Sequence, residues 1–505
     1  MAIQGQTREA TPVVDSGTRR NFAAYYLNFI VMAAVGVIVN PLLLGALGPA
    51  LFGVWKSLQR YLDFATVADG RASQALKWIV ASRTSLSDAE KQRDVGAAIT
   101  VWFRWLPVAA LVAAGVTAAM PFLIKGIPDD ARAVAYTAAL ILAANTVLAG
   151  LLAIPDSVLT GINQGYKSMI ITTVVFVVSN AAMVGAAYAG WTLWSLAAIV
   201  LIAAILNTVL TLAVAKRAVA WWGVAKPTKP DIRRVFGYSA WTLGGMLVDK
   251  MLLASELIVI SVMVGAVAVT QYTFTAYVLQ FVLAISLVTA SGFMPVLGSQ
   301  LGNSEMAAAA ERARSVRRLV IGVTVLGCAA VLAFNGTFVA LWVGADQYLG
   351  NGINMLLVVC ALQQAFVRMD GQILDVTLKI APRVMVGLAS SAGGIAAGCI
   401  GFALTHDLEL ALTGVIIARL ASNVAYPVFV RRAIPGSAAP RSTVLLGSSL
   451  LIASFGVGLL MERLGGAEQV IVAGGWLLVA VATAWFGLLP RAILRALISR
   501  RSTSC

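Results

Sequence analysis

Long apolar runs constrain the fold of this chain more than any other feature of its sequence. A helix needs about 20 apolar residues to cross the hydrocarbon core of a bilayer, and the sequence holds fourteen runs of about that length. Only 12% of its residues are charged, and its mean hydropathy is +0.87. Soluble proteins carry about 25% charged residues. We therefore predict an all-α integral membrane protein with about 14 transmembrane helices.

The fourteen predicted spans form two groups of six and a final pair. The first group covers residues 22–44, 50–79, 99–123, 132–155, 168–188 and 191–215. The second group covers residues 236–263, 267–293, 317–342, 352–375, 382–404 and 409–430. The pair covers residues 443–461 and 468–489.

The charge of the loops predicts how these spans cross the membrane, because Lys and Arg concentrate in cytoplasmic loops. With the amino terminus in the cytoplasm, 28 of the 37 Lys and Arg residues fall in the cytoplasmic tails and loops or in the cytoplasmic parts of the spans beside them, and the outer loops hold only Lys125, Arg132 and Arg463. We therefore predict that both termini are cytoplasmic. These basic loops explain the net charge of +15. No basic stretch is interleaved with aromatic residues, so nucleic acid is not a predicted partner.

The two groups of six spans carry signs of an internal repeat, because corresponding residues recur at a constant spacing along the chain. Gly48, after the first span, corresponds to Gly265, after the seventh, and the same spacing relates Ser87, a predicted helix start, to Ser304. Because each copy has an even number of spans, both copies have the same orientation, and the repeat axis lies along the membrane normal. The predicted domains are a tail at 1–21, an N-lobe at 22–215, a linker at 216–235, a C-lobe at 236–430, an added pair at 431–489 and a tail at 490–505.

The span at 50–79 carries charges that a lipid-facing helix would not keep. Lys56, Arg60 and Asp63 fall within roughly 60° of one another on a helix that is otherwise largely apolar at this level. A charge near the middle of a membrane helix costs roughly 2.5–3.5 kcal/mol. Since such a stripe is kept only where it faces protein or water, we predict that it lines an internal cavity.

The sequence around this stripe resembles a known family. The segment Leu47-Gly48-Pro49-Ala50-Leu51-Phe52-Gly53-Val54-Trp55, followed by Asp69-Gly70 and Ala75, resembles the signature after the first helix of polysaccharide-unit flippases. These flippases belong to the multidrug/oligosaccharidyl-lipid/polysaccharide exporter superfamily. The topology of two six-helix lobes with an extra pair is also similar to that family, over the whole chain.

The resemblance implies a flippase that moves an undecaprenyl-pyrophosphate-linked oligosaccharide across the bacterial inner membrane for surface polysaccharide synthesis. It implies two pseudo-twofold six-helix lobes in a V around a central cavity that opens to either side in turn. The implied partners are the lipid-linked oligosaccharide, membrane lipids and the polysaccharide polymerase machinery. The family places basic cavity residues on its second helix, so Lys56 and Arg60 become candidate ligands of the pyrophosphate, which needs cations in a low-dielectric cavity. The alternative is a structural network of Lys56 and Arg60 with Asp63.

The span at 236–263 carries Asp249, Lys250 and Glu256. Asp249 and Glu256 are seven residues apart and share a helix face. Such a carboxylate pair, with Asp63, predicts a site for H+ or Na+ that couples transport to an ion gradient. The alternative is that Lys250 neutralises one of these acids inside the bundle.

Further cations lie in later spans. We predict Lys250, Arg368 and Arg419 as additional contacts of an anionic substrate, with the alternative that each is a structural partner of an acid. Arg368 shares a helix face with Asp375. We expect His406, the single histidine, to be a solvated residue of an outer loop.

Other chemistries are not predicted. The four cysteines, Cys328, Cys360, Cys399 and Cys505, lack metal-ligand spacing, so free thiols are expected and no metal site is predicted. No Gly-rich phosphate loop indicates an ATPase, and no cofactor is predicted. An ion-coupled multidrug exporter of the same superfamily is the alternative function, although the membrane-embedded charges show no acidic excess. A membrane glycan ligase or polymerase would need a large outer loop, so we predict a protein that is not an enzyme.

Overall fold

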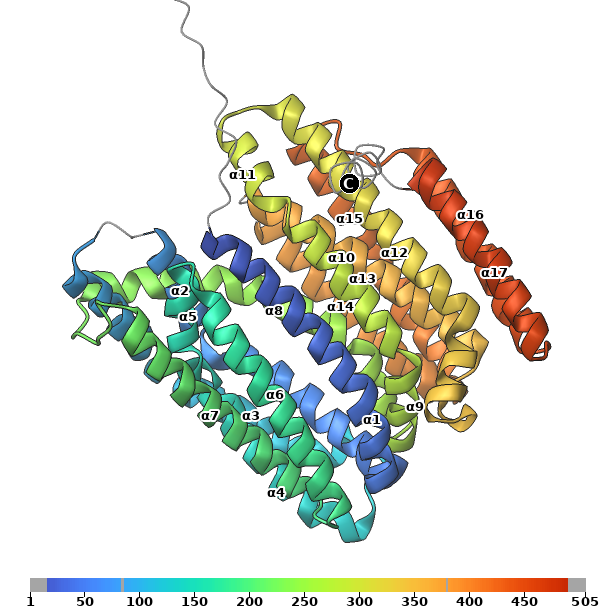
Figure 1. The fold of residues 1–505 in the computed structure, drawn as a ribbon, viewed down its shortest axis with the longest axis horizontal. Coiled ribbons are helices and arrows are strands. Elements are labelled where there is room, and N and C mark those ends of the chain that lie inside the picture. Colours follow the sequence, from blue (N-terminus) through green and yellow to red (C-terminus); the bar gives the residue numbers. More distant parts are fainter. Residues whose placement is uncertain (1–15, 83–85, 378–379, 489–505) are drawn as a thin grey trace, which may run out of the picture. The chain divides into compact units, whose positions relative to one another are not determined.

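The computed structural model describes residues 16–82, 86–377 and 380–488, which form helices joined by turns (Figure 1). The helices of the first half are α1 (Ser16–Ala65), α2 (Ala72–Ser82), α3 (Asp88–Leu123), α4 (Arg132–Leu152), α5 (Ile154–Gly161), α6 (Gly165–Tyr188) and α7 (Leu193–Ala218). They are followed by α8 (Lys229–Met263), α9 (Ala266–Thr275), α10 (Tyr277–Ser291), α11 (Met294–Gly302), α12 (Met306–Val343) and α13 (Asn351–Val376). The last helices are α14 (Ile380–Thr405), α15 (Leu408–Ala433), α16 (Arg441–Met461) and α17 (Gly466–Thr483).

Among the described residues, twelve helical stretches are long and apolar enough to cross a membrane. The first of them, Ala23–Asp69, has 47 residues, is interrupted at Gly48, and takes in the predicted span 22–44 and most of the predicted span 50–79. The rest of the span 50–79 lies beyond a left-handed turn at Gly70 and Arg71, mostly in α2. Helix α8 is not one of the twelve, because its apolar half holds Asp249, Lys250 and Glu256. Apart from these two differences the stretches correspond to the fourteen predicted spans. The predicted class, an all-α membrane protein, is confirmed.

Left-handed backbone conformations recur with the spacing of the repeat. Gly48 (φ 72°) interrupts α1, and its counterpart Gly265 (φ 135°) separates α8 from α9. Gly126 (φ 73°) and Gly344 (φ 100°) follow α3 and α12, and their spacing along the chain is almost the same. Glycine adopts a positive φ without the steric cost that a Cβ imposes. These glycines therefore mark sharp breaks between helices that both copies of the repeat share.

The helices pack into two compact units. The first unit takes in Met1–Ala46, Ala65–Thr117 and Tyr136–Thr242, and the second takes in Leu47–Phe64, Ala118–Ala135 and Leu243–Cys505. The part of α1 that carries the charged stripe, Leu47–Phe64, therefore packs with the second unit, although it lies in the first half of the sequence. The predicted lobe boundary at the linker 216–235 stays a prediction.

In the first unit the linker lies against the first turns of α3. The backbone N–H of Ala225 donates to the carbonyl oxygen of Gln92 at 3.1 Å, and Arg234 forms an ion pair with Asp94 at 3.1 Å. Asp231, at the start of α8, is buried, which raises its pKa. Hydrogen bonds from Thr228 and the charges of the neighbouring arginines outweigh this effect, so the pKa of Asp231 is below its usual value. The linker is thus fastened to α3 by hydrogen bonds and ion pairs.

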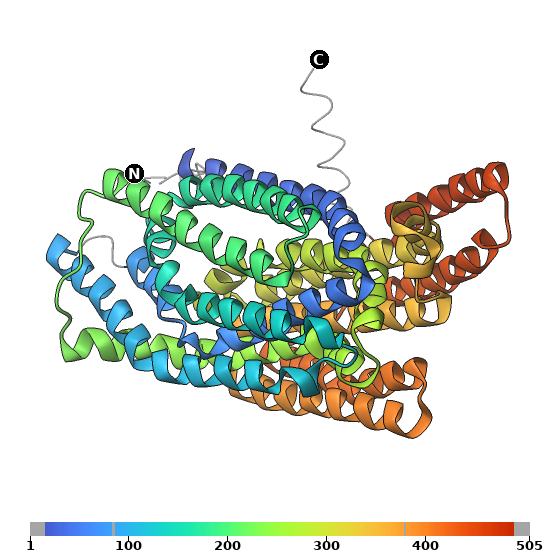
Figure 2. The same ribbon diagram turned by 90° about the horizontal axis from the view of Figure 1, so that it is seen from below.

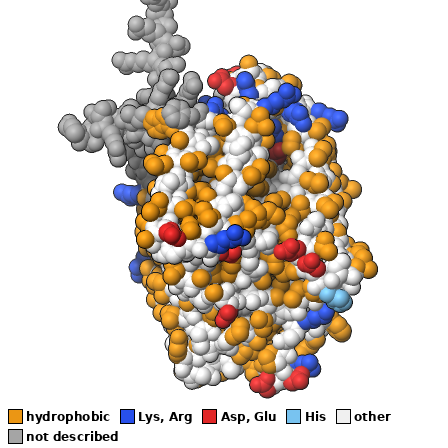
Figure 3. Space-filling view, turned by 90° about the vertical axis from the view of Figure 1, so that its right-hand side faces the viewer, with side chains coloured by type: hydrophobic (Ala, Val, Ile, Leu, Met, Phe, Trp, Pro, Cys, Tyr) orange, Lys and Arg blue, Asp and Glu red, His pale blue; other side chains and the backbone are white. Residues whose placement is uncertain are grey.

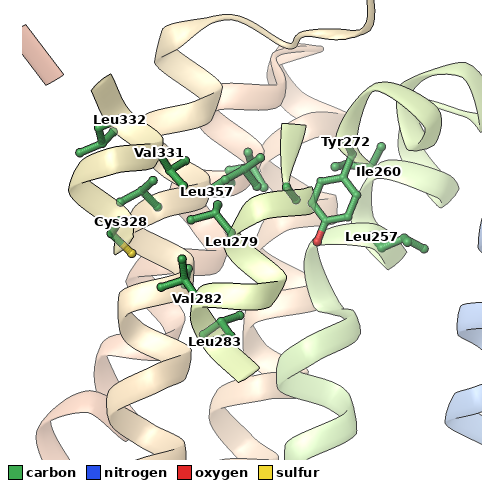
Figure 4. Packing of buried hydrophobic residues seen from close by; sticks show 14 of the residues in the cluster. Leu257, Ile260, Tyr272, Leu279, Val282, Leu283, Cys328, Val331, Leu332 and Leu357 are labelled. Atoms are coloured by element: carbon green, nitrogen blue, oxygen red, sulfur yellow. The ribbon is translucent and has the colours of Figure 1, made fainter. Parts of the chain in front are cut away.

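The core of the second unit lies among α8, α9, α10, α12 and α13. Figure 4 shows Tyr272, Leu279, Val282, Cys328 and Leu357 packed there, and all of them are buried. The added helices α16 and α17 form a hairpin joined by a short loop, drawn in red in Figures 1 and 2. Helix α16 packs along α12 and α17 packs on α16. These neighbours extend the second unit beyond its six-helix core.

The outer surface of the second unit suits a lipid environment. Hydrophobic side chains cover much of the face in Figure 3, with Lys and Arg gathered towards its upper end. On α16 and α17, Leu445, Ile452 and Ile471 are largely exposed. Contiguous apolar surface of this kind is rare on soluble monomers. It is expected where helices face lipid, so the chain is a multi-pass membrane protein.

Candidate substrate site

The segment Leu47–Phe64 is held in the second unit by close contacts along one side. A Cβ at Gly53 would lie 1.8 Å from the carbonyl oxygen of Ala266, so only glycine allows the segment to approach α9 this closely. The Thr270 hydroxyl donates to the carbonyl oxygen of Pro49 at 2.6 Å. The rings of Phe52 and Phe274 stack with centroids 5.3 Å apart. These contacts fix the rotation of the helix that carries the charged stripe.

Further along the segment, Tyr61 continues this line of contacts. Its hydroxyl donates to the carbonyl oxygen of Leu123 at 3.0 Å and also hydrogen-bonds with the Ser261 hydroxyl. Because α3 and α8 end at Leu123 and Met263, the Tyr61 side chain reaches towards the ends of both helices. The break at Gly48 lies in a predicted outer loop, and a helix rises about 1.5 Å per residue. Lys56 and Arg60 therefore lie about 12 and 18 Å beyond the break, near the middle of a hydrocarbon core about 30 Å thick.

Lys56 and Arg60 are both partly buried. Nζ of Lys56 lies 5.2 Å from the centre of the Phe52 ring, at cation–π distance. Arg60 interacts electrostatically with the phenol of Tyr272. Across the described residues, no ion pair joins Lys56 or Arg60 to a carboxylate. The two cations therefore leave positive charge within the membrane-spanning part of the second unit.

Asp63, the acid of the stripe, pairs with a residue far away in the sequence. Its Oδ2 lies 2.5 Å from Nζ of Lys250 on α8, and the two side chains are 48% and 18% exposed. From the sequence, Asp63 was a possible partner of Lys56 and Arg60, and Lys250 a possible partner of Asp249 or Glu256. The structure brings Asp63 and Lys250 together instead.

Asp249 belongs to a second network, in which two arginines share it. Its Oδ1 lies 3.9 Å from Nε of Arg368 and 3.7 Å from Nη2 of Arg383. Arg383 is 4% exposed, forms an ion pair with Asp375 and donates to the carbonyl oxygen of Gly371 at 3.1 Å. Arg368 and Asp375, which were predicted to share a helix face, belong to the same network. Arg368 contacts Asp249, and Asp375 contacts Arg383.

Arg383 is a residue of this network that sequence reasoning missed. It is the second residue of the predicted span 382–404, but none of the predicted sites includes it. That position inside an apolar run was the available signal, since a charge within a span usually has a partner.

Glu256 and Arg419 form a third, fully buried network. Nη1 of Arg419 lies 2.6 Å from Oε1 of Glu256, and the side chains are 0% and 2% exposed. Gln364 donates to the same carboxylate oxygen at 2.8 Å, and Arg419 also donates to the Ser255 hydroxyl and, at 2.6 Å, to the carbonyl oxygen of Leu252. A pair with this many hydrogen bonds joins α8, α13 and α15. Asp249 and Glu256, predicted to act together, belong to separate networks.

Other candidates lie apart from these networks. Asp370 pairs with Arg317 at 2.5 Å, and both side chains are nearly buried. His406 adopts φ 55° in the turn between α14 and α15, where its ring lies against Phe402. Cys328, Cys360 and Cys399 are free thiols. In the part of the chain that the structure describes, no cluster of His, Cys, Asp and Glu could hold a metal ion.

Comparison with solved structures shows which known folds this chain resembles. The chain is similar to an inward-facing multidrug resistance MATE family transporter of the MOP superfamily, with a TM-score of 0.63 and 13% identity over 83% of this chain and 98% of that one. It is also similar to lipid II flippase MurJ in an inward closed conformation, with a TM-score of 0.63 and 12% identity over 95% of this chain and 99% of that one. These two similarities show that the chain shares the fold of those membrane proteins.

A family assignment follows from the sequence. Residues 47–345, more than half of the chain, match the model of a family described as polysaccharide biosynthesis protein. The chain belongs to this family of polysaccharide biosynthesis proteins. No curated protein sequence matches it. The matched region begins at the break before the charged stripe, so the segment that carries Lys56 and Arg60 is part of what defines the family.

Proposed function

We propose that this transporter moves an undecaprenyl-pyrophosphate-linked oligosaccharide across the bacterial inner membrane for surface polysaccharide synthesis, by alternating access. The observation that carries the proposal is that Lys56 and Arg60, near the predicted middle of the membrane, form no ion pair with any acid in the described part of the chain. Buried charge is costly unless it is compensated. A pyrophosphate brings negative charge and several acceptor oxygens, which Arg binds bidentately and Lys binds as a point charge.

The comparisons support the same substrate class. The description of the family is polysaccharide biosynthesis protein, and one of the similar structures is a lipid II flippase. Both point to a substrate that joins a glycan to a lipid. We include Lys250, Arg368 and Arg419 in the proposed substrate-binding set, with Lys250 nearest to the stripe through Asp63. Arg419 is fully buried in this conformation, so it would contact substrate only after its network opens.

We also propose that an acid of α8 couples transport to H+ or Na+. The sequence predicts three acids for ion coupling: Asp63, Asp249 and Glu256. Asp249 fits best because its side chain is 33% exposed and its ion-pair distances are long, 3.7 and 3.9 Å. Asp63 and Glu256 each have a cation within 2.6 Å.

The coupling proposal predicts a selective defect. Asp249→Asn should slow transport driven by a proton or sodium gradient, while gradient-free exchange of the lipid-linked substrate continues at nearly the original rate. Asp375→Asn, at the other carboxylate of the same network, is the matched control and should affect both modes alike. Equal loss of both modes in Asp249→Asn would identify Asp249 as a structural partner of Arg368 and Arg383.

The proposed orientation places both termini in the cytoplasm of a bacterial cell. Reporter fusions at Lys125, His406 and Glu462 should report the periplasm, and fusions at Glu90 and Pro227 should report the cytoplasm. A periplasmic signal from the Pro227 fusion would overturn the arrangement of the spans. In this setting the polysaccharide polymerase machinery is the proposed partner that receives the product, and the transporter itself catalyses no covalent chemistry.

The test of the function is transfer in a defined bilayer. Full-length protein in liposomes should move a fluorescent undecaprenyl-pyrophosphate-linked oligosaccharide between leaflets, as measured with a membrane-impermeant quencher. The Lys56→Ala/Arg60→Ala variant should lose at least about tenfold in rate, since each charged hydrogen bond contributes about 1.5–3 kcal/mol. Arg104→Ala, at an exposed cation of α3, is the matched control and should keep the original rate. Transfer by the double variant at the original rate would refute the proposed site.

A multidrug exporter is the second candidate, because one of the similar structures is a multidrug resistance transporter. That function predicts transport of a cationic dye by the same liposomes. The uncompensated cations Lys56 and Arg60 disfavour it, because they repel a cationic substrate. Dye transport without movement of the lipid-linked oligosaccharide would favour the exporter.

A further inference from the structure

The ion pair between Asp63 and Lys250 differs from its neighbours in how exposed it is. Its two atoms are 2.5 Å apart, yet the Asp63 side chain is 48% exposed. The Glu256–Arg419 pair has nearly the same distance, 2.6 Å, but its side chains are 2% and 0% exposed. Exposed ion pairs contribute little because water also stabilises the separated charges, whereas breaking a buried pair strands both charges. The Asp63–Lys250 pair can therefore exchange partners at low cost.

Asp63 also lies beside the two cations that have no acid. It is three residues from Arg60 and seven from Lys56, so all three side chains share one stripe of the helix. The ion pair brings Lys250 to the same stripe. Asp63 is therefore paired with one cation, Lys250, and shares its helix stripe with two others, Lys56 and Arg60.

We propose that Asp63 is a positioning residue that occupies Lys250 in the empty transporter and is displaced from it by the pyrophosphate of the substrate. This inference rests on the proposed function. The ammonium group of Lys250 has three N–H donors and acts as a point charge, so its geometry suits carboxylate and phosphate oxygens equally. A pyrophosphate held by Lys56 and Arg60 carries more negative charge than the carboxylate, so it competes favourably for Lys250. The released Asp63 carboxylate turns to the solvent to which it is already half exposed.

The exchange would change how the segment is fastened. The contacts of Pro49, Gly53 and Tyr61 hold it to α9 and to the ends of α3 and α8. The ion pair fastens its carboxyl end to the middle of α8. Displacement of Asp63 removes this link to α8, while the contacts of Pro49, Gly53 and Tyr61 stay. Occupation of the substrate site is thereby linked to movement of the helix that carries it.

A double-mutant cycle on substrate affinity tests this exchange. Full-length protein in lipid nanodiscs is titrated with undecaprenyl pyrophosphate, and the dissociation constant is measured for the original chain, Asp63→Asn, Lys250→Gln and the double variant. Removing the competitor should tighten binding in Asp63→Asn by about three- to fivefold, the effect expected of one exposed ion pair. Lys250→Gln should weaken binding. In the Lys250→Gln background, Asp63→Asn should have no further effect.

Each other outcome overturns a defined part of the proposal. If Asp63→Asn tightens binding equally in the Lys250→Gln background, Asp63 acts through its charge alone and does not occupy Lys250. If Asp63→Asn leaves affinity unchanged or lowers it, the pair is structural and the exchange is refuted, although the proposed function stands. If the original chain does not bind undecaprenyl pyrophosphate, the proposed function fails and this inference fails with it.

A kinetic measurement separates positioning from folding. In the liposome assay Asp63→Asn should lower KM together with kcat, because substrate binds more tightly but the segment is no longer fastened when the site is empty. Asp63→Glu keeps the carboxylate and should restore both values. A higher KM in Asp63→Asn would contradict the exchange.

Discussion

The two copies of the internal repeat share the breaks in their backbone but not their charges. Gly190 (φ 79°) and His406 (φ 55°) are separated by almost the same spacing as Gly48 and Gly265 or Gly126 and Gly344, and they extend that series. The turn that requires a left-handed residue is therefore kept even where the second copy has a histidine instead of a glycine. Positive φ is tolerated by few residues other than glycine. The backbone breaks belong to the fold that both copies must adopt.

The charged residues follow no such pattern. At the spacing that relates Gly48 to Gly265, the counterparts of Lys56 and Arg60 in the second copy are Thr273 and Tyr277. In the opposite direction, the counterpart of Arg419 in the first copy is Ile202, which is apolar. Among the described residues, Lys56 and Arg60 of the first copy form no ion pair, whereas Arg317 and Arg419 of the second copy each form a buried pair with an acid. We infer that these two buried pairs fasten helices together and that Lys56 and Arg60 are kept for a ligand.

The largest effect should come from breaking the buried pair of the second copy. Arg419→Ala leaves Glu256 buried without its cation, which costs about 3–5 kcal/mol. We expect a strong loss of folded protein, measured as the monodisperse fraction after heating in detergent. The variant Glu256→Gln/Arg419→Met removes both charges and should recover most of that loss. If Arg419→Ala were as stable as the original chain, the Glu256–Arg419 pair would not hold helices of the second copy together.

A smaller effect is expected where the first copy packs against the second. Gly53→Ala places a Cβ 1.8 Å from the carbonyl oxygen of Ala266, so the two helices must move apart. Overpacking of this kind costs about 1–3 kcal/mol. The melting temperature of the purified protein should fall. Gly115→Ala in α3 meets no atom within 4 Å and is the matched control, which should melt at or above the original temperature.

The smallest effect on stability should come from the cations of the first copy. Lys56→Ala and Arg60→Ala remove charges that form no ion pair among the described residues. The free energy of unfolding should therefore change by no more than about 0.5 kcal/mol. Transport should nevertheless be lost. Arg60→Lys should be only partly tolerated, because Lys cannot reproduce the bidentate contact of Arg with phosphate. A marked loss of stability in Lys56→Ala or Arg60→Ala would place these cations in a structural network instead.

The sequence predicted the helices because apolar runs of membrane length are a property of neighbouring residues. It also predicted the register of the repeat, which the glycines with positive φ at Gly48 and Gly265 confirm. It did not predict that α1 continues to Ala65 as one helix with an interruption, since the break depends on the conformation of a single residue.

The partners of the charged residues could not be predicted in the same way. Helical periodicity compares residues on one helix, and it paired Asp249 with Glu256. The structure pairs Glu256 with Arg419, which lies on a helix far along the chain, and assigns Asp249 to Arg368 and Arg383. Such pairings depend on which helices are neighbours in space.

The central claim is that Lys56 and Arg60 recognise the charge of the lipid-linked substrate. The most direct measurement compares the affinity of the protein in nanodiscs for undecaprenyl pyrophosphate and for uncharged undecaprenol. The original chain should prefer the pyrophosphate by at least about tenfold. This preference should disappear in Lys56→Ala/Arg60→Ala and persist in Arg104→Ala, which removes an exposed cation of α3. A preference that survives the loss of both Lys56 and Arg60 would contradict the account.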